Sequence, residues 1–237
     1  MLAQAHAFTT AKVDFAKLST CRGLSPQNAG RIMAVSTLEK KLPGQNVFGE
    51  GDNADNIYEV VSGMLRLYKL LPDGRRQITG FLSAGHILGL APEGTYVYSA
   101  EAITEVTLCR YTRRAVERLM DEVPGFARRL LAVTSHELRS AQDQMLLLGR
   151  KTAGEKVVSF LLLMAARQGD EEANEVSVPM TRADIADYLG LTIETVSRTF
   201  TKLKLDAVIA LPTRGKVEIL DHDRLEEFAA GDSDEDF

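Results

Sequence analysis

Three polar residues toward the C-terminal end, Glu194, Ser197 and Arg198, are suited to hydrogen bonding with the edges of nucleobases. The guanidinium of Arg198 is a planar fork that can donate two hydrogen bonds to guanine O6 and N7, and the carboxylate of Glu194 can accept one from cytosine N4. Residues four apart lie on the same face of a helix, so both side chains can address one G·C pair or adjacent pairs, with Ser197 between them. The alternative is a Glu194–Arg198 ion pair on a solvated helix surface, which is common at this spacing.

The surrounding segment, residues 180–205, predicts two helices joined by a sharp turn. Thr181 is a suitable N-cap for the first helix, and Asp184 favours its positive end. Gly190 permits the turn, and Thr192 caps the second helix. The residues expected to face inward on the second helix recur at 3,4,3 spacing and are Ile193, Val196, Phe200 and Leu203. This pattern is typical of a helix-turn-helix, whose second helix enters the DNA major groove.

Hydroxyl and cationic side chains around these helices are expected to contact DNA phosphates, which position a protein without reading bases. Downstream, residues 208–211 and 216–220 flank a turn at 212–215 and predict two strands, the wing of a winged helix. A generic charged surface hairpin is the alternative. The wing would bring Lys216 beside the groove together with Arg214. The predicted phosphate-contacting residues are Thr181, Thr192, Thr201, Lys202, Lys204 and Arg214.

A long helix is predicted from Pro124 to Leu148, upstream of the helix-turn-helix. Its seam residues follow the 4,3 spacing of a two-helix coiled coil, which indicates a dimer interface. The alternative is a helix that packs on its own domain. Gly149 is expected to end this helix, and Thr152 and Glu155 form a capping-box pattern that starts the next one. The predicted seam residues are Ala127, Leu131, Thr134, Leu138, Ala141, Met145 and Leu148.

The first half of the chain has a different pattern of residue types. Residues 25–36 predict a short helix with Ser25 as its cap and Pro26 at its first position. From about residue 43 to residue 110, short β-rich runs alternate with turns that contain glycine, as at Pro72-Asp73-Gly74. Many short strands punctuated in this way favour a small antiparallel barrel or sandwich.

Composition narrows the class of protein. Of 237 residues, 45% are hydrophobic and 26% are charged, which excludes wholesale disorder. The net charge of −5 is unevenly placed: residues 221–237 hold eight acids and one arginine, or −7, so residues 1–220 carry +2. A basic face for phosphates is therefore compatible with an acidic total. The longest mainly apolar run, residues 157–166, has half the length that a membrane-spanning helix needs. Residues 1–20 do not resemble a signal peptide.

Two cysteines cannot form a disulfide framework and indicate a reducing compartment. We therefore expect a cytoplasmic protein with no membrane partner. The sequence contains no nucleophile-elbow, metalloprotease or P-loop motif and no paired-cysteine metal motif, so an enzyme is not expected.

Taken together, the chain resembles the CRP/FNR superfamily of bacterial transcription regulators over roughly residues 20–230, and most closely the FixK-like branch. The segments that carry the resemblance are 51–63, 70–80, 85–89 and 194–198. It implies an α+β fold with an N-terminal β-roll sensor domain (a double-stranded β-helix, jelly-roll-like), a long dimerisation helix and a C-terminal winged helix-turn-helix. The expected domains are an N-terminal segment and β-roll at 1–120, the dimerisation helix at 121–150, the DNA-binding domain at 151–230 and an acidic tail at 231–237.

The same resemblance implies the site residues and the partners. Glu194, Ser197 and Arg198 match the base-reading triplet of FNR-type members, which bind palindromes such as TTGAT-N4-ATCAA. The expected partners are double-stranded DNA, a second copy of the chain and RNA polymerase, with candidate polymerase-contacting loops at 50–52 and 73–75. The implied role is that of an activator in low-oxygen or nitrogen-fixation gene control.

Cofactor binding is not expected. Members that bind cyclic AMP use a Gly-Glu pair and an Arg-Ser pair, whereas the matching positions here hold Leu90 and Tyr98, which offer neither a carboxylate nor a positive charge. Oxygen-sensing members use four cysteines for an iron–sulfur cluster, and this chain has Cys21 and Cys109 alone. No haem-ligand signature is clear. We expect Cys109 to be a buried small hydrophobe and Cys21, in an exposed N-terminal segment, to be a candidate redox thiol. The alternative function is an effector-dependent regulator that responds to an unidentified small molecule or redox signal.

Overall fold

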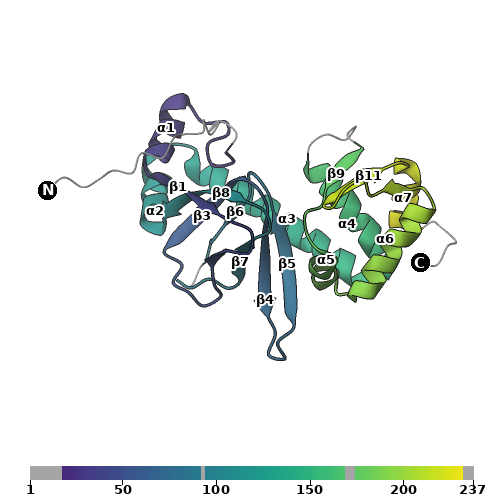
Figure 1. Ribbon diagram of the computed structural model, residues 1–237. Coiled ribbons are helices and arrows are strands. Elements are labelled where there is room, and N and C mark those ends of the chain that lie inside the picture. Colours follow the sequence, from purple (N-terminus) through teal and green to yellow (C-terminus); the bar gives the residue numbers. More distant parts are fainter. Residues whose placement is uncertain (1–17, 92–93, 169–173, 232–237) are drawn as a thin grey trace.

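The computed structural model describes residues 18–91, 94–168 and 174–231, which form a strand-rich N-terminal part and a helical C-terminal part joined by one long helix (Figure 1). The N-terminal strands make two four-stranded antiparallel sheets, ordered β1-β8-β3-β6 and β2-β7-β4-β5. These strands are β1 (Ser36–Lys41), β2 (Asn46–Phe48), β3 (Asn56–Ser62), β4 (Leu65–Leu70), β5 (Arg76–Leu82), β6 (Ile87–Leu88), β7 (Ser99–Ala102) and β8 (Val106–Thr112). The expected β-roll is confirmed, and we use this name for the two sheets.

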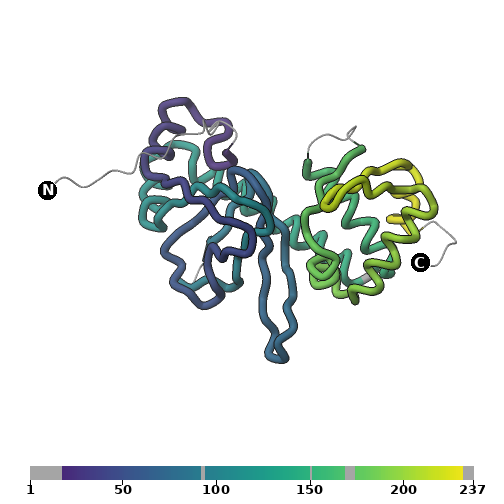
Figure 2. Tube along the Cα trace, in the orientation of Figure 1, coloured from purple at the N-terminus to yellow at the C-terminus, as the bar shows by residue number. Residues whose placement is uncertain are grey.

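The β4–β5 hairpin extends beyond the rest of the β-roll (Figure 2). Its turn has the chemistry that the sequence predicts: Gly74 has φ 83°, and the carboxylate of Asp73 accepts a hydrogen bond from the backbone N–H of Arg75 at 3.0 Å. Near its base, this hairpin pairs β4 with β7. The base of the hairpin therefore belongs to a sheet, and its tip projects beyond that sheet.

Three helices accompany the β-roll. Helix α1 (Pro26–Ala34) begins as predicted at Ser25, whose side chain accepts from the N–H of Asn28. Helix α2 (Arg113–Glu122) was not predicted, and it continues past the expected domain boundary at residue 120. Helix α3 (Phe126–Arg150) is the predicted long helix.

Gly149 does not end α3, contrary to prediction. The chain leaves the helix at Lys151, with ψ 146°, because Thr152 must adopt an extended conformation as N-cap of the next helix. The capping box of Thr152 and Glu155 is present as predicted.

The C-terminal part builds its helices around one apolar core with a three-stranded sheet, ordered β10-β11-β9. Fully buried side chains such as Phe160, Leu189 and Leu203 form its centre. Helix α7 lies within residues 221–237, the segment singled out by its eight acids, and it was not predicted. The elements are α4 (Ala153–Arg167), β9 (Glu175–Ser177), α5 (Arg182–Leu189), α6 (Ile193–Leu205), β10 (Ile209–Ala210), β11 (Lys216–Ile219) and α7 (His222–Ala230). Of the expected acidic tail, residues 232–237 lie outside the described residues.

A buried carboxylate joins the two parts. The side chain of Asp184, on α5, is 2% exposed, and its Oδ1 accepts hydrogen bonds from Arg66 on β4 at 2.9 Å and from Arg76 on β5 at 2.6 Å. Its other oxygen, Oδ2, accepts from the backbone N–H and the hydroxyl of Thr181 at 3.0 and 2.8 Å. One carboxylate thus starts α5 and holds it against the β-roll. We call Asp184, Arg66 and Arg76 the Asp184 cluster.

Neighbouring contacts strengthen the same junction. Arg76 also donates through Nε to Asp187 at 2.9 Å, and Gln77 donates to the backbone carbonyl of Asp187 at 2.7 Å. The ring of Phe81, on β5, lies 5.0 Å from that of Tyr188, on α5, measured between centroids. Figure 1 shows β5 beside α5. The helix-turn-helix is therefore seated on the β4–β5 hairpin through both polar and aromatic contacts.

Replacing Asp184 by alanine leaves two guanidinium groups without their shared anion in a buried position. Arg66 keeps Glu101 as an ion-pair partner at 2.5 Å and Arg76 keeps Asp187 at 2.8 Å, so neither charge is left uncompensated. We expect the free energy of unfolding to fall by about 2–4 kcal/mol through the lost charged hydrogen bonds and the lost cap of α5, measured by urea denaturation followed by circular dichroism. The matched control is Asp73→Ala, which removes an exposed ion pair with Arg75 and should lower the free energy of unfolding far less. Equal losses in the two variants would contradict the structural role of the Asp184 cluster.

Candidate nucleic-acid interface

Helices α5 and α6 form the predicted turn. Thr181 caps α5 in a reciprocal box with Asp184, and α5 ends at Gly190, which has φ 64° in the left-handed region. Thr192 caps α6 by accepting a hydrogen bond from the N–H of Thr195 at 3.2 Å. The local signals that start and stop both helices are thus those read from the sequence.

The buried face of α6 differs from the prediction at one end. Val196, Phe200 and Leu203 are buried as expected, but Ile193 is 48% exposed. Ile193 lies in the first turn, and the face is completed by Thr199, whose hydroxyl donates to the carbonyl of Thr195 at 3.0 Å and so is satisfied while buried. The prediction that Ile193 faces inward is wrong.

The three predicted base-reading residues lie on the other side of α6. Glu194 and Arg198 are exposed, and Ser197 is half-buried. Within residues 18–91, 94–168 and 174–231, Arg198 makes no ion pair or side-chain hydrogen bond, so the expected alternative of a Glu194–Arg198 surface pair is not formed. Hydrogen bonds from its own backbone N–H and from the Thr192 hydroxyl lower the pKa of Glu194, which keeps it an ionised acceptor. The donor fork and the acceptor are both available to a ligand.

The predicted phosphate-contacting residues around this face differ in how far they are exposed. Thr181, Thr192, Thr201, Lys204 and Arg214 are exposed, and Lys202 is half-buried. All three threonine hydroxyls are already engaged: that of Thr181 donates to Asp184 at 2.8 Å, that of Thr192 accepts from the N–H of Thr195 at 3.2 Å, and that of Thr201 donates to the carbonyl of Ser197 at 2.9 Å. On the wing, Lys216 pairs with Glu175 at 2.5 Å, whereas the tip residue Arg214 is exposed.

Sequence reasoning missed Arg182, the first residue of α5. Its guanidinium carbon lies 3.2 Å from the centroid of the Phe200 ring, a cation–π contact between α5 and α6. Burial lowers the pKa of Arg182 to about 10. The sequence signal was present, a cation at the first position of a helix and an aromatic residue on the next one, but the spacing alone does not show that they meet.

Arg182 also lines a depression between the start of α5 and the wing. It has a volume of about 430 Å³, and its cationic lining is Arg182, Arg214 and Lys216. The N-terminus of α5 adds the positive end of the helix dipole. The edge of the helix-turn-helix therefore concentrates positive charge although the whole chain carries −5.

The predicted seam of α3 is largely uncovered in the single chain. Leu131, Leu138 and Met145 are 66%, 60% and 68% exposed. Ala127 and Ala141 are also exposed, and Thr134 and Leu148 are half-buried. The opposite face of α3 packs on the β-roll through Val133 and Phe126.

Leu90 and Tyr98, the positions that the resemblance matches to cyclic-nucleotide contacts, line a cavity of about 380 Å³ between the β-roll, α3 and α5. Leu90 and Tyr98 are both in its wall, and the N–H of Gly89 donates to the Tyr98 hydroxyl at 3.4 Å. Burial raises the pKa of Tyr98, so this side chain supplies no charge. These two residues present neither a carboxylate to a ribose nor a cation to a phosphate.

The two cysteines are both buried. Cys109 is 0% exposed, as predicted for a small hydrophobe. The expectation that Cys21 is exposed is wrong: it is 3% exposed, because the carboxylate of Glu59 accepts hydrogen bonds from Ser19 and Thr20 and holds this turn against the β-roll. Burial raises the pKa of the Cys21 thiol, which disfavours the reactive thiolate.

Within the described ranges, no group of three or more His, Cys, Asp or Glu residues is placed to hold a metal ion. Among those same residues, no helix combines the length and the hydrophobicity of a membrane span.

Two family models match the chain. Residues 38–123 match a cyclic nucleotide-binding domain, and residues 155–228 match a Crp-like helix-turn-helix domain. The transcriptional activatory protein AadR of Rhodopseudomonas palustris is 44% identical over 215 residues, which cover 90% of each chain. The nitrogen fixation regulation protein FixK of Bradyrhizobium diazoefficiens is 47% identical over 191 residues, which cover 79% of each.

The solved structure of FixK2 from Bradyrhizobium japonicum has a TM-score of 0.76 and 39% identity, covering 82% of this chain and 97% of that one. Its likeness extends over the β-roll and the helix-turn-helix together. With these relatives and both family models in agreement, the chain belongs to the CRP/FNR family of transcription regulators, in its FixK-like branch.

Proposed function

We propose that this chain acts as a homodimer that reads a TTGAT-N4-ATCAA-like palindrome through the major groove. The observation that carries the proposal is the exposed guanidinium of Arg198, which has no partner among the residues that the structure describes. It lies four residues after the ionised carboxylate of Glu194, on the face of α6 that the core leaves uncovered. Each half site contains one G·C pair. A guanidinium fork for guanine and a carboxylate for cytosine are the groups that such a pair demands.

Phosphate contacts fix the register of this helix in the groove. Lys204 on α6 and Arg214 on the wing are exposed cations on either side of the base-reading face, and the start of α5 adds a third positive region. We propose that these groups, with the hydroxyls of Thr181, Thr192 and Thr201 and with Lys202, bind the backbone and supply most of the salt-dependent affinity.

Replacing Arg198 tests the base contact. For Arg198→Ala, we expect binding to the palindrome to weaken by about 1–3 kcal/mol, with little change on a scrambled duplex, as measured by fluorescence anisotropy at a fixed salt concentration. Arg198→Lys retains the charge and loses the fork, so it should also lose discrimination at the G·C pair.

The control for this measurement is Lys204→Ala, which removes an exposed cation from the same helix. It should weaken binding to both duplexes alike and reduce the slope of log affinity against log salt by about 1. If Arg198→Lys discriminates between the duplexes as well as the unmodified protein does, Arg198 contacts a phosphate and the proposed base readout is wrong.

The dimer is proposed from the seam of α3. Exposed leucine and methionine side chains recur along it at coiled-coil spacing, and a monomer would leave this apolar stripe in water. The proposed interface residues are Ala127, Leu131, Thr134, Leu138, Ala141, Met145 and Leu148. A two-fold axis along α3 would pair two copies of α6 with the two half sites of a palindrome.

A charge in the centre of this seam should prevent association. We expect Leu138→Arg to sediment as a monomer in analytical ultracentrifugation and to lose high-affinity binding to the palindrome, because a buried, unpaired guanidinium is strongly unfavourable. Leu70→Arg adds the same charge at an exposed leucine on β4 and should remain dimeric. A dimeric Leu138→Arg would show that the two copies meet elsewhere.

We further propose that the chain activates transcription in low-oxygen or nitrogen-fixation gene control, in the cytoplasm, with RNA polymerase as a partner and without enzymatic activity. The name of the AadR relative supports activation, and that of the FixK relative supports a role in nitrogen-fixation control. The proposed units are the N-terminal segment and β-roll at 1–120, the dimerisation helix at 121–150 and the DNA-binding domain at 151–230. The buried Cys21 and the uncharged pair Leu90 and Tyr98 favour DNA binding by the purified protein without an added effector.

The alternative is regulation by an effector, and the cavity behind Tyr98 is the observation that favours it. That cavity contacts the β-roll, α3, Arg167 on α4 and Tyr188 on α5, so a ligand there would touch every part that positions α6. A purified protein that bound the palindrome only after a small molecule was added would select this alternative.

A further inference from the structure

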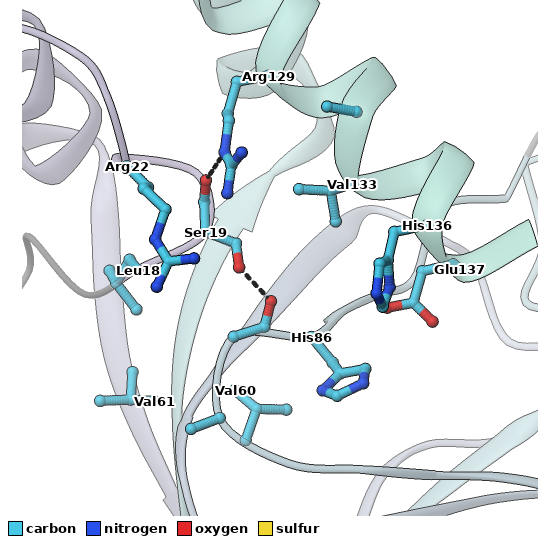
Figure 3. Close-up of a pocket in the computed structure, with 13 residues that line it drawn as sticks. Leu18, Ser19, Arg22, Val60, Val61, His86, Arg129, Val133, His136 and Glu137 are labelled. Atoms are coloured by element: carbon cyan, nitrogen blue, oxygen red, sulfur yellow. Dashed lines mark hydrogen bonds between the residues drawn. The ribbon is translucent and has the colours of Figure 1, made fainter. Parts of the chain in front are cut away.

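A further pocket, larger than the two described above, lies beside the β5–β6 turn (Figure 3). Its volume is about 540 Å³, within the usual range for small-molecule sites. It is enclosed by the turn that contains Ser19, by the β5–β6 turn that contains His86, and by α3. Neither Leu90 nor Tyr98 lines it, and Glu137 is the residue that it shares with the cavity at the cyclic-nucleotide positions, so the two are neighbouring pockets.

The walls of this pocket are held together by hydrogen bonds. The hydroxyl of Ser19 donates to the carbonyl of Gly85, which links the first wall to the second. Nε of Arg129 donates to the carbonyl of Ser19, which links the first wall to α3. Figure 3 shows both bonds at the edge of the open space. A rigid, preformed cavity loses little entropy when it orders a ligand.

Positive charge predominates on the lining. Arg22 and Arg129 line the pocket with one acid, Glu137. Within residues 18–91, 94–168 and 174–231, the guanidinium of Arg22 has no hydrogen-bond or ion-pair partner, and Arg129 uses Nε alone. The buried carboxylate of Glu59 lies behind the wall, where Ser19 and Thr20 occupy its oxygens.

The remaining lining is mainly apolar. Leu18, Val60, Val61 and Val133 supply hydrocarbon surface, and burial lowers the pKa of the His86 imidazole, which favours its neutral form. The pocket therefore combines two guanidinium groups at one end with a mainly apolar wall, and its one acid, Glu137, lies with His136 away from them (Figure 3). Guanidinium groups bind carboxylates and phosphates in a bidentate manner, and an apolar wall accepts the carbon skeleton that carries them.

We propose that this pocket binds a small organic anion, with its carboxylate or phosphate between Arg22 and Arg129 and its hydrocarbon part against Val60 and Val133. The ligand joins the N-terminal turn to α3, on the face of that helix opposite the proposed dimer seam. This inference goes beyond the proposed function and does not require it, since the pocket lies outside the helix-turn-helix.

The test uses three six-carbon probes on the full chain, with ¹³C-labelled valine and leucine methyl groups observed by NMR at constant ionic strength. Hexanoate and hexyl phosphate should produce saturable shifts at Val60, Val61 and Val133, with dissociation constants in the millimolar range that is usual for fragments. Hexanol, which has no charge, should produce none at the same concentration. Whichever anion binds more tightly identifies the head group.

Two variants and a control test which cations bind the anionic head group of the ligand. Arg22→Gln, at a residue with no described side-chain contact, and Arg129→Gln should each weaken binding by about tenfold or more, since each removes a charge-assisted contact. Arg128→Gln removes an exposed cation next to Arg129 that does not line the pocket, and it should bind as the unmodified protein does. The proposal is overturned if neither anion shifts these methyl groups, if hexanol binds equally well, or if Arg22→Gln behaves like Arg128→Gln.

Discussion

The arrangement of the whole molecule depends on a single buried carboxylate. Asp184 starts α5 through its bonds with Thr181, and through its other oxygen it anchors that helix to Arg66 and Arg76 of the β-roll. Buried charges are tolerated when they are paired and fully hydrogen-bonded, and this one is. Because α6 packs on α5, the same bonds set the direction in which Glu194 and Arg198 face. The same carboxylate thus caps α5 locally and holds the helix-turn-helix against the distant β-roll.

Much of the helix-turn-helix could be predicted from the sequence because its signals are local. Caps at Thr181 and Thr192, the turn at Gly190 and the buried positions of Val196 and Phe200 depend on neighbours within one or two helical turns. Contacts between distant residues left no such signal. Asp184 reads as an ordinary acid in a first helical turn, and its pairing with Arg66, more than a hundred residues away, becomes visible only in the folded chain.

The predictions that failed also lacked a reliable local signal in the sequence. The burial of Cys21 follows from Glu59, a residue on a distant strand whose carboxylate holds the N-terminal turn in place. Helix α7 was not predicted because its acids were grouped with those of the acidic end. Its Leu225 and Phe228 nevertheless complete the core of the C-terminal part. Ile193 has the right spacing for burial and fails at the end of a helix. Patterns of three or four residues describe the middle of an element better than its margins.

The uncovered seam of α3 has a consequence for gene control. In the proposed dimer, two copies meet along it before both half sites are engaged, so the abundance of the DNA-competent form would rise with the square of the monomer concentration while most chains are still single. A cell that doubled its synthesis of this regulator would then nearly quadruple the amount able to occupy a promoter. A dimer formed along this seam would convert a gradual change in protein level into a steeper transcriptional response.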